Sequence, residues 1–152
     1  RNIALGVEDE QIDDHRLQES LRQARVTSFL GQLSNGVETF LGERGVRLSG
    51  GQRQRVALAR AFYHGRRVLI MDEATSALDN RTQAIVTDSL NRRKVTRIAI
   101  AHRLSTVRGA DCIYTLRDGR VIESGTHEQL LASDGLYSEL CRTSFLDDQA
   151  QR

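Results

Sequence analysis

Apolar residues recur at helix-like spacing in the first part of the chain, over residues 8–25. This spacing predicts an amphipathic helix with a thin apolar stripe and an otherwise solvated surface. A second short helix is expected over residues 29–33, ended by a turn at residues 34–36. Residues 39–48 are polar and punctuated by glycine, which indicates a surface loop.

The middle of the chain alternates between helical and strand-like patterns. A helix is expected over residues 53–63, and another over residues 80–92 with Asp79 as its N-cap. Residues 68–71 and 97–101 are short apolar runs, which indicates strands. Strand, helix and strand in this order favour a βαβ unit with parallel strands, which are commonly buried on both faces. We therefore predict an α/β fold with two buried strands.

The last third of the chain predicts a hairpin followed by helices. Residues 112–116 and 120–124 have strand-like patterns and flank an Asp-Gly pair at positions 118–119, a strong hairpin signal. Helical patterns follow over residues 126–131 and from residue 136 onward.

Composition restricts the function more than the fold. The 152 residues are 39% hydrophobic, which is enough for one core of ordinary size. The net charge is only +2 and basic residues are scattered among acidic ones, so no nucleic acid is expected as a partner. No apolar run approaches the roughly 20 residues that span a bilayer, so we expect the polypeptide itself to be soluble. Cys112 and Cys141 lie within apolar patterns and are predicted to be small core residues.

The most distinctive stretch is Leu48-Ser49-Gly50-Gly51-Gln52, just ahead of the helix expected from Arg53. The first N–H groups of a helix have no partner within it, and the helix dipole adds about half a positive charge there. Glycine lets an anion such as phosphate approach the backbone, and the Ser49 hydroxyl can donate a further hydrogen bond. The same residues also fit a simple capped turn with Ser49 as the N-cap, and that alternative stays open at this point.

Three titratable residues follow the two predicted strands. Asp72 and Glu73 come directly after residues 68–71, and His102 follows residues 97–101. Because ligands of open α/β sheets gather at the carboxyl ends of the strands, these side chains are candidate site residues. One acid could be a helix cap, but two acids and a histidine on the same rim favour a functional site.

These stretches together resemble the nucleotide-binding domain of ATP-binding-cassette (ABC) exporters, in the family's order and over nearly the whole chain. Residues 48–52 resemble the ABC signature, residues 68–73 the Walker B strand with its glutamate, and residues 76–79 the D-loop. His102 is similar to the switch histidine. Glu43-Arg44-Gly45 resembles the exporter loop that faces the coupling helices of the membrane domain.

The resemblance implies a fold and an activity. The fold class would be α/β, with part of the parallel sheet of a P-loop NTPase (RecA-like) core and an N-terminal helical sub-domain that carries the signature. Residues 1–63 would form this sub-domain, and residues 64–152 the C-terminal part of the ATPase core. The implied activity is ATP hydrolysis that powers export, at the cytoplasmic face of a membrane.

The resemblance also implies roles for single residues. Asp72 would hold Mg²⁺, Glu73 would orient or deprotonate the attacking water, and His102 would contact the γ-phosphate. In this family two nucleotide-binding domains pack head to tail, and Asp79 would reach across their interface. Ser49 and Gly51 would donate to the γ-phosphate of ATP bound to the partner domain, with Gly50 and Gln52 beside them. The expected cofactors are therefore ATP and Mg²⁺.

One feature of the family is missing from this chain. The phosphate-binding P-loop requires the lysine of G-x-x-x-x-G-K-[ST]. The only lysine here is Lys94, which follows Asn91-Arg92-Arg93 and cannot be that residue. Residues 1–6 resemble the segment after the family's glutamine-bearing loop, so we expect the chain to be the C-terminal part of the domain. Alone, it should be unable to bind ATP in the usual way.

Two other functions remain open on the sequence. The chain could belong to a soluble ABC ATPase that acts on nucleic acid or ribosomes, or it could be a non-catalytic half that only completes a partner's site. The Glu43-Arg44-Gly45 loop and residues 117–131 resemble exporters and favour transport. The presence of Glu73 and His102 argues against a degenerate, non-catalytic domain.

Overall fold

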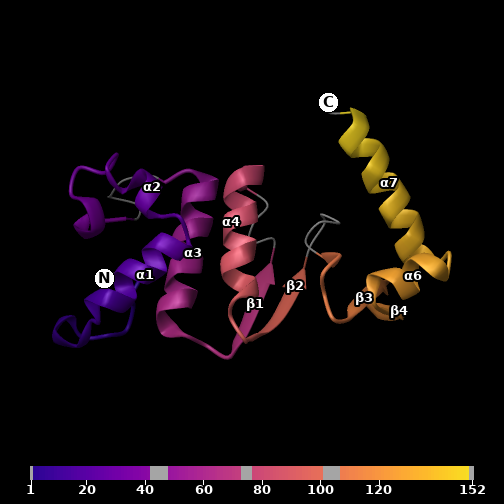
Figure 1. Cartoon of the computed structure of the whole chain (residues 1–152), viewed down its shortest axis with the longest axis horizontal. Helices are drawn as coiled ribbons and strands as arrows, with labels where there is room; N and C mark the ends of the chain where they lie inside the picture. Colours follow the sequence, from indigo (N-terminus) through magenta and orange to yellow (C-terminus); the bar gives the residue numbers. More distant parts are fainter. Residues whose placement is uncertain (1, 42–47, 73–76, 101–106, 151–152) are drawn as a thin grey trace. The chain divides into compact units, whose positions relative to one another are not determined.

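The computed structural model describes residues 2–41, 48–72, 77–100 and 107–150 (Figure 1). The chain forms two compact units, Arg1–Ile98 and Ala99–Arg152. These two units do not test the predicted division of the complete ATPase domain into sub-domains after residue 63, which stays a prediction. Among the described residues, no helix combines the length and the apolar character needed to cross a membrane.

The first unit opens with short helical segments before its main helix. These segments are η1 (Asp9–Gln11), α1 (Asp14–Gln23), α2 (Thr27–Leu30) and η2 (Gly36–Glu38), and the main helix is α3 (Gly50–His64). The first helix is shorter than the predicted span of residues 8–25, because Asp13 caps it. The Asp13 carboxylate accepts a hydrogen bond from the N–H of Arg16 at 3.0 Å. The second predicted helix is present as α2.

Helix α3 begins at Gly50, three residues before the predicted start, and ends where Gly65 adopts a positive φ of 59°. Helix α1 packs across it. The hydroxyl of Tyr63, near the end of α3, accepts a hydrogen bond from the N–H of Asp13 at 3.2 Å. The end of α3 therefore supports the start of α1.

The predicted strand, helix and strand follow as β1 (Val68–Asp72), α4 (Asn80–Asn91) and β2 (Thr96–Ile100), with β1 and β2 paired in parallel. Leu69 joins the core that α1, α3 and α4 build. The prediction that both faces of these strands are buried is wrong, since Ile70 is 73% exposed and Ile98 is 53% exposed. Of the two strands, β1 buries Leu69, whereas every residue of β2 is exposed.

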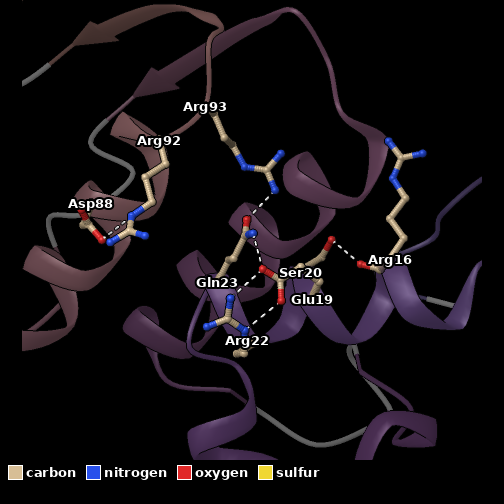
Figure 2. Close-up of polar contacts among 8 residues, drawn as sticks. All are labelled: Arg16, Glu19, Ser20, Arg22, Gln23, Asp88, Arg92 and Arg93. Atoms are coloured by element: carbon tan, nitrogen blue, oxygen red, sulfur yellow. Dashed lines mark hydrogen bonds and ion pairs between the residues drawn. The ribbon is translucent and has the colours of Figure 1, made fainter.

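A polar cluster joins α1 to the turn after α4 (Figure 2). Arg93 donates from Nη2 to Oε1 of Gln23 at 2.5 Å, and its guanidinium lies 4.4 Å from the ring centre of Phe62. Gln23 donates to Glu19 at 2.6 Å, and Glu19 also accepts two hydrogen bonds from Arg22. The cluster therefore links α1, α3 and α4 around the core.

The second unit is a β-hairpin with two helices. Strands β3 (Ile113–Arg117) and β4 (Arg120–Gly125) pair antiparallel as predicted, and α6 (His127–Ala132) and α7 (Leu136–Ala150) follow. The φ values of Asp118 and Gly119 are 51° and 73°, as a type I′ hairpin turn requires. A register shift after Thr115 adds a bulge to β4.

The core of the second unit contains Cys141, which is buried as predicted. The same prediction for Cys112 is wrong, because this side chain is exposed. Along β3, burial alternates from Ile113 to Thr115, so apolar residues at the other positions face away from the core. The remaining buried apolar residues of this core are Ile113, Leu130 and Tyr137.

Candidate functional site

The first turn of α3 is closed by a reciprocal pair of hydrogen bonds. The Oγ atom of Ser49 accepts from the N–H of Gln52 at 3.2 Å, and Oε1 of Gln52 accepts from the N–H of Ser49 at 2.9 Å. This capping box confirms that Ser49 is the N-cap. It also leaves the anion interpretation intact, because the Ser49 hydroxyl accepts here and can still donate its own proton. The N–H groups of Gly50 and Gly51 precede the first intrahelical hydrogen bond.

The second glycine of this turn has a structural reason that the sequence did not reveal. A Cβ at Gly51 would lie 2.6 Å from the carbonyl oxygen of Ala77 and 3.6 Å from Cδ2 of Leu78. A Cβ at Gly50 would lie 3.4 Å from Cβ of Ala77, an ordinary contact. The α3 turn is therefore packed against residues 77–78 of the same chain, and only Gly51 must be bare for this packing.

Two side chains of α3 that we did not single out in the sequence lie close to this turn: Gln54 extends the contact with residue 77, and Arg55 connects the turn to Ser28. Gln54 accepts a hydrogen bond from the N–H of Ala77 at 3.1 Å. Arg55 donates to the carbonyl oxygen of Gly51 at 3.3 Å and to Oγ of Ser28 at 3.0 Å. Their spacing in the sequence could have indicated this, because residues three and four positions after Gly51 lie on the same face of the helix as Gly51.

Asp79 is an exposed N-cap of α4, as predicted. Its carboxylate accepts a hydrogen bond from the N–H of Thr82 at 2.9 Å, and the hydrogen bonds from Thr82 lower the pKa of Asp79. Burial lowers the pKa of Arg55, whose guanidinium lies 4.6 Å from the ring centre of Phe29, while the charge of Asp79 opposes that shift. Residues 77–79 thus connect the α3 turn to the start of α4.

Asp72 ends β1 beside an open hollow of about 260 Å³. Its carboxylate is exposed, and the side chain of Gln54 lines the same hollow from α3. The other lining residues come from α3 and β1: Ala57, Leu58, Ala61, Leu69, Ile70 and Met71. The structure therefore brings the end of β1, the first turns of α3 and residues 77–79 together within the first unit.

The remaining predicted site residues lie outside the described part of the chain. These are Glu73, His102 and the Glu43-Arg44-Gly45 loop. Within the residues that are described, no three histidine, cysteine, aspartate or glutamate side chains form a group that could hold a metal ion. Asp72 is thus the one predicted metal ligand whose position can be stated, as an exposed carboxylate at the end of β1.

Comparisons with known proteins add to these structural observations. Residues 1–76 match the family described as "ABC transporter". The ABC-type transporter fsqE of Aspergillus fumigatus is 45% identical over 141 residues, which are 91% of this chain and 11% of that protein. The ATP-dependent lipid A-core flippase of Saccharophagus degradans is 47% identical over 146 residues, which are 95% of this chain and 25% of that protein.

A solved structure agrees with these matches. It is described as a bacterial Atm1-family ABC exporter with ATP bound, and it has a TM-score of 0.84 at 40% identity over 93% of this chain and 25% of that chain. Our chain thus spans a quarter or less of the length of these three proteins. The predicted fold class is confirmed, as part of the α/β fold of an ABC ATPase. The chain belongs to the ABC transporter family.

Proposed function

We propose that this chain is part of a nucleotide-binding domain that hydrolyses ATP to drive an exporter, at the cytoplasmic face of a membrane. The observation that best supports this proposal is the capped, two-glycine turn of α3, which packs on residues 77–78 and lies near the hollow that Asp72 lines. The relatives named above are described as a transporter, a flippase and an exporter. Those descriptions support transport over the soluble ATPase alternative.

The α3 turn suits the γ-phosphate of ATP. The Ser49 hydroxyl and the N–H groups of Gly50 and Gly51 are three donors at the positive end of a helix dipole. ATP itself would be held mainly by a second nucleotide-binding domain packed head to tail, with Gln52 beside the phosphate. Asp79 is exposed and would reach across that interface while it caps α4.

The donor chemistry at the end of β1 suits Mg²⁺. Asp72 offers an exposed carboxylate, an oxygen ligand of the kind that Mg²⁺ prefers, and it would hold the ion through water. When bound, the ion would supply charge neutralisation for phosphoryl transfer. Glu73 would orient or deprotonate the attacking water, and His102 would contact the γ-phosphate.

The 152-residue chain alone should show no ATPase activity above background. It contains no G-x-x-x-x-G-K-[ST] motif, and its single lysine, Lys94, lies in the sequence just after α4. The complete domain that contains this chain would supply the phosphate-binding loop. The ATP that the α3 turn contacts would be bound mainly by the partner domain. The membrane domains would contact the Glu43-Arg44-Gly45 loop.

The test is ATP hydrolysis by a complete transporter that carries this segment, compared with its Glu73→Gln variant. We expect turnover to fall by about 100-fold or more with ATP binding retained, because an amide cannot accept the proton of the attacking water. The matched control is Glu128→Gln, an exposed acid on α6, which should leave turnover unchanged. A fully active Glu73→Gln variant would contradict the role of Glu73. Mg²⁺-dependent hydrolysis by the 152-residue chain alone would contradict the need for a second domain.

A further inference from the structure

Arg55 bridges the first turn of α3 and the segment that leads into α2. Its Nε atom donates to the carbonyl oxygen of Gly51 at 3.3 Å. Its Nη1 atom donates to the carbonyl oxygen of Arg25 at 3.3 Å and to Oγ of Ser28 at 3.0 Å. The planar fork of a guanidinium holds such donors in fixed directions, which the single nitrogen of a lysine cannot do. One side chain therefore ties the turn to a segment that comes well before it in the sequence.

The segment at the other end of this bridge is itself well fixed. Phe29 is 3% exposed and belongs to the core of the first unit, and the Arg55 guanidinium lies 4.6 Å from its ring centre. The carbonyl oxygen of Arg25 also accepts from the hydroxyl of Ser28 at 2.8 Å. Arg55 therefore holds the turn against a segment that core packing keeps in place.

The surroundings of this guanidinium differ from those of an arginine that only solubilises a surface. Burial lowers the pKa of Arg55, the charge of Asp79 opposes that shift, and the positive charge of Arg25 adds to it. The hydrogen bonds and the aromatic contact compensate for the lost hydration. Two roles fit these contacts, which are general stabilisation of the fold and placement of the turn through Gly51.

The turn contains the donors that the proposed function assigns to phosphate. Ser49 and Gln52 close the turn through their capping box, and both bonds of that box lie within the turn. The bond from Arg55 acts on the peptide group between Gly51 and Gln52 and connects it to residues 25–28. The orientation of the turn is therefore linked to the core of the first unit as well as to its own helix.

We propose that Arg55 is a positioning residue, which fixes the first turn of α3 to residues 25–29 and so keeps the donors of Ser49, Gly50 and Gly51 aligned for a phosphate. The inference rests on the proposed function for its catalytic consequence, but not for the contact itself. Arg55 touches no phosphate in this role. Donors that are already aligned need no reorganisation when charge develops on a phosphate, and misaligned donors lower turnover more than substrate binding.

The first arm of the test uses the 152-residue chain and measures backbone order parameters of Gly50 and Gly51 by ¹⁵N relaxation. They should be about 0.85 in the parent and fall to about 0.6 in Arg55→Met. Arg55→Lys keeps the charge and most of the stem, which guards against a folding defect, and it should behave as Arg55→Met because it lacks the fork. Unchanged order parameters in both variants would overturn the inference.

A matched control separates placement of the turn from general stabilisation. Arg60 lies further along α3, and its Nε atom donates to the carbonyl oxygen of Asn2 at 2.9 Å. Arg60→Met therefore removes a bond of the same kind away from the turn, and it should leave the order parameters of Gly50 and Gly51 unchanged. An equal fall in this control would show that any loosening of α3 has the same effect, and would overturn the inference.

The second arm uses the complete transporter and separates kcat from KM for ATP. Arg55→Met and Arg55→Lys should each lower kcat by about tenfold with KM changed less than about twofold, while Arg60→Met should change neither. A parental kcat in Arg55→Lys would show that the charge suffices, and a raised KM with unchanged kcat would show that Arg55 binds substrate; either would overturn the positioning role. A complete parent transporter without ATPase activity would contradict the proposed function instead, while the first arm would still decide whether Arg55 holds the turn.

Discussion

Gly51 and Ala77 meet so closely that the Cα of the glycine faces the carbonyl oxygen of the alanine with no room for a side chain. A Cβ at Gly51 would lie 2.6 Å from that oxygen, whereas a Cβ at Gly50 finds its nearest neighbour at 3.4 Å. The two glycines of the α3 turn are therefore not equivalent. Packing within the chain requires a glycine at position 51, whereas a Cβ at position 50 would make only an ordinary contact.

Gly51→Ala should lower the free energy of unfolding by about 1–3 kcal/mol, because the new methyl group displaces the backbone at Ala77. Gly50→Ala should change it by about 0.5 kcal/mol or less, since its Cβ makes an ordinary contact. Urea unfolding of the 152-residue chain, followed by circular dichroism, measures both values. Equal destabilisation by the two substitutions would show that the close contact with Ala77 does not set the difference.

Glu19 should titrate well below an ordinary glutamate. Hydrogen bonds from Arg22 and then from Gln23 lower its pKa from 4.5 to about 2 (Figure 2). Since the pKa is lower in the folded chain, the carboxylate stabilises the fold above pH 4.5, and that contribution is lost as the pH falls toward 2. Carboxyl chemical shifts recorded by NMR against pH give the value directly.

Arg22→Gln is the variant that tests the cause of this shift. It removes the first-named partner and should raise the pKa of Glu19 toward 4.5. Arg92→Gln is the control, because Arg92 pairs with Asp88 on α4 rather than with Glu19. Added salt should also raise the pKa of Glu19, since the pair is exposed to solvent. A pKa that Arg22→Gln leaves unchanged would contradict this account.

The elements with local signals could be predicted from the sequence. Asp118 and Gly119 adopt the two positive φ angles of a tight hairpin turn, and Asp79 caps α4 through a residue three positions away. The exposure of Ile70 and Ile98 could not be predicted. Their own residue types indicate buried strands, but burial also requires an element that covers the second face, and a strand's sequence does not report whether one is present.

Some contacts of the candidate site could also be predicted from the sequence, and others could not. The capping box at Ser49 and Gln52 depends on two residues three positions apart, so its pattern is visible in the sequence. The contact between Gly51 and Ala77 joins segments that are far apart in the chain, and it leaves no periodic or local pattern. The same holds for the bond from Ala77 to Gln54, because the preceding strand β1 has to be in place before the two residues meet.

Glu123 on β4 should stabilise α7 as an N-terminal anion. Its two carboxylate oxygens accept from the N–H groups of Leu136 at 3.0 Å and Tyr137 at 2.8 Å. Glu123→Ala removes both bonds and should cost about 1–2 kcal/mol of unfolding free energy, measured by thermal or urea unfolding. Glu139→Ala, an exposed acid in the first turn of the same helix, should cost less. An equal cost for both would mean that charge near the helix, and not the two hydrogen bonds, carries the effect.

The exposed side of the β1–β2 sheet should make the 152-residue chain self-associate. Ile70 is 73% exposed and Ile98 is 53% exposed on neighbouring strands, and apolar side chains gathered on a sheet face favour association in water. The double substitution Ile70→Asn and Ile98→Asn should shift the chain toward monomer in sedimentation and light-scattering measurements across a concentration series. Leu5→Asn, at a 60% exposed apolar residue away from the strands, is the control and should change the association little. A parent chain that stays monomeric at high concentration would contradict the prediction, and so would equal relief of association by the control.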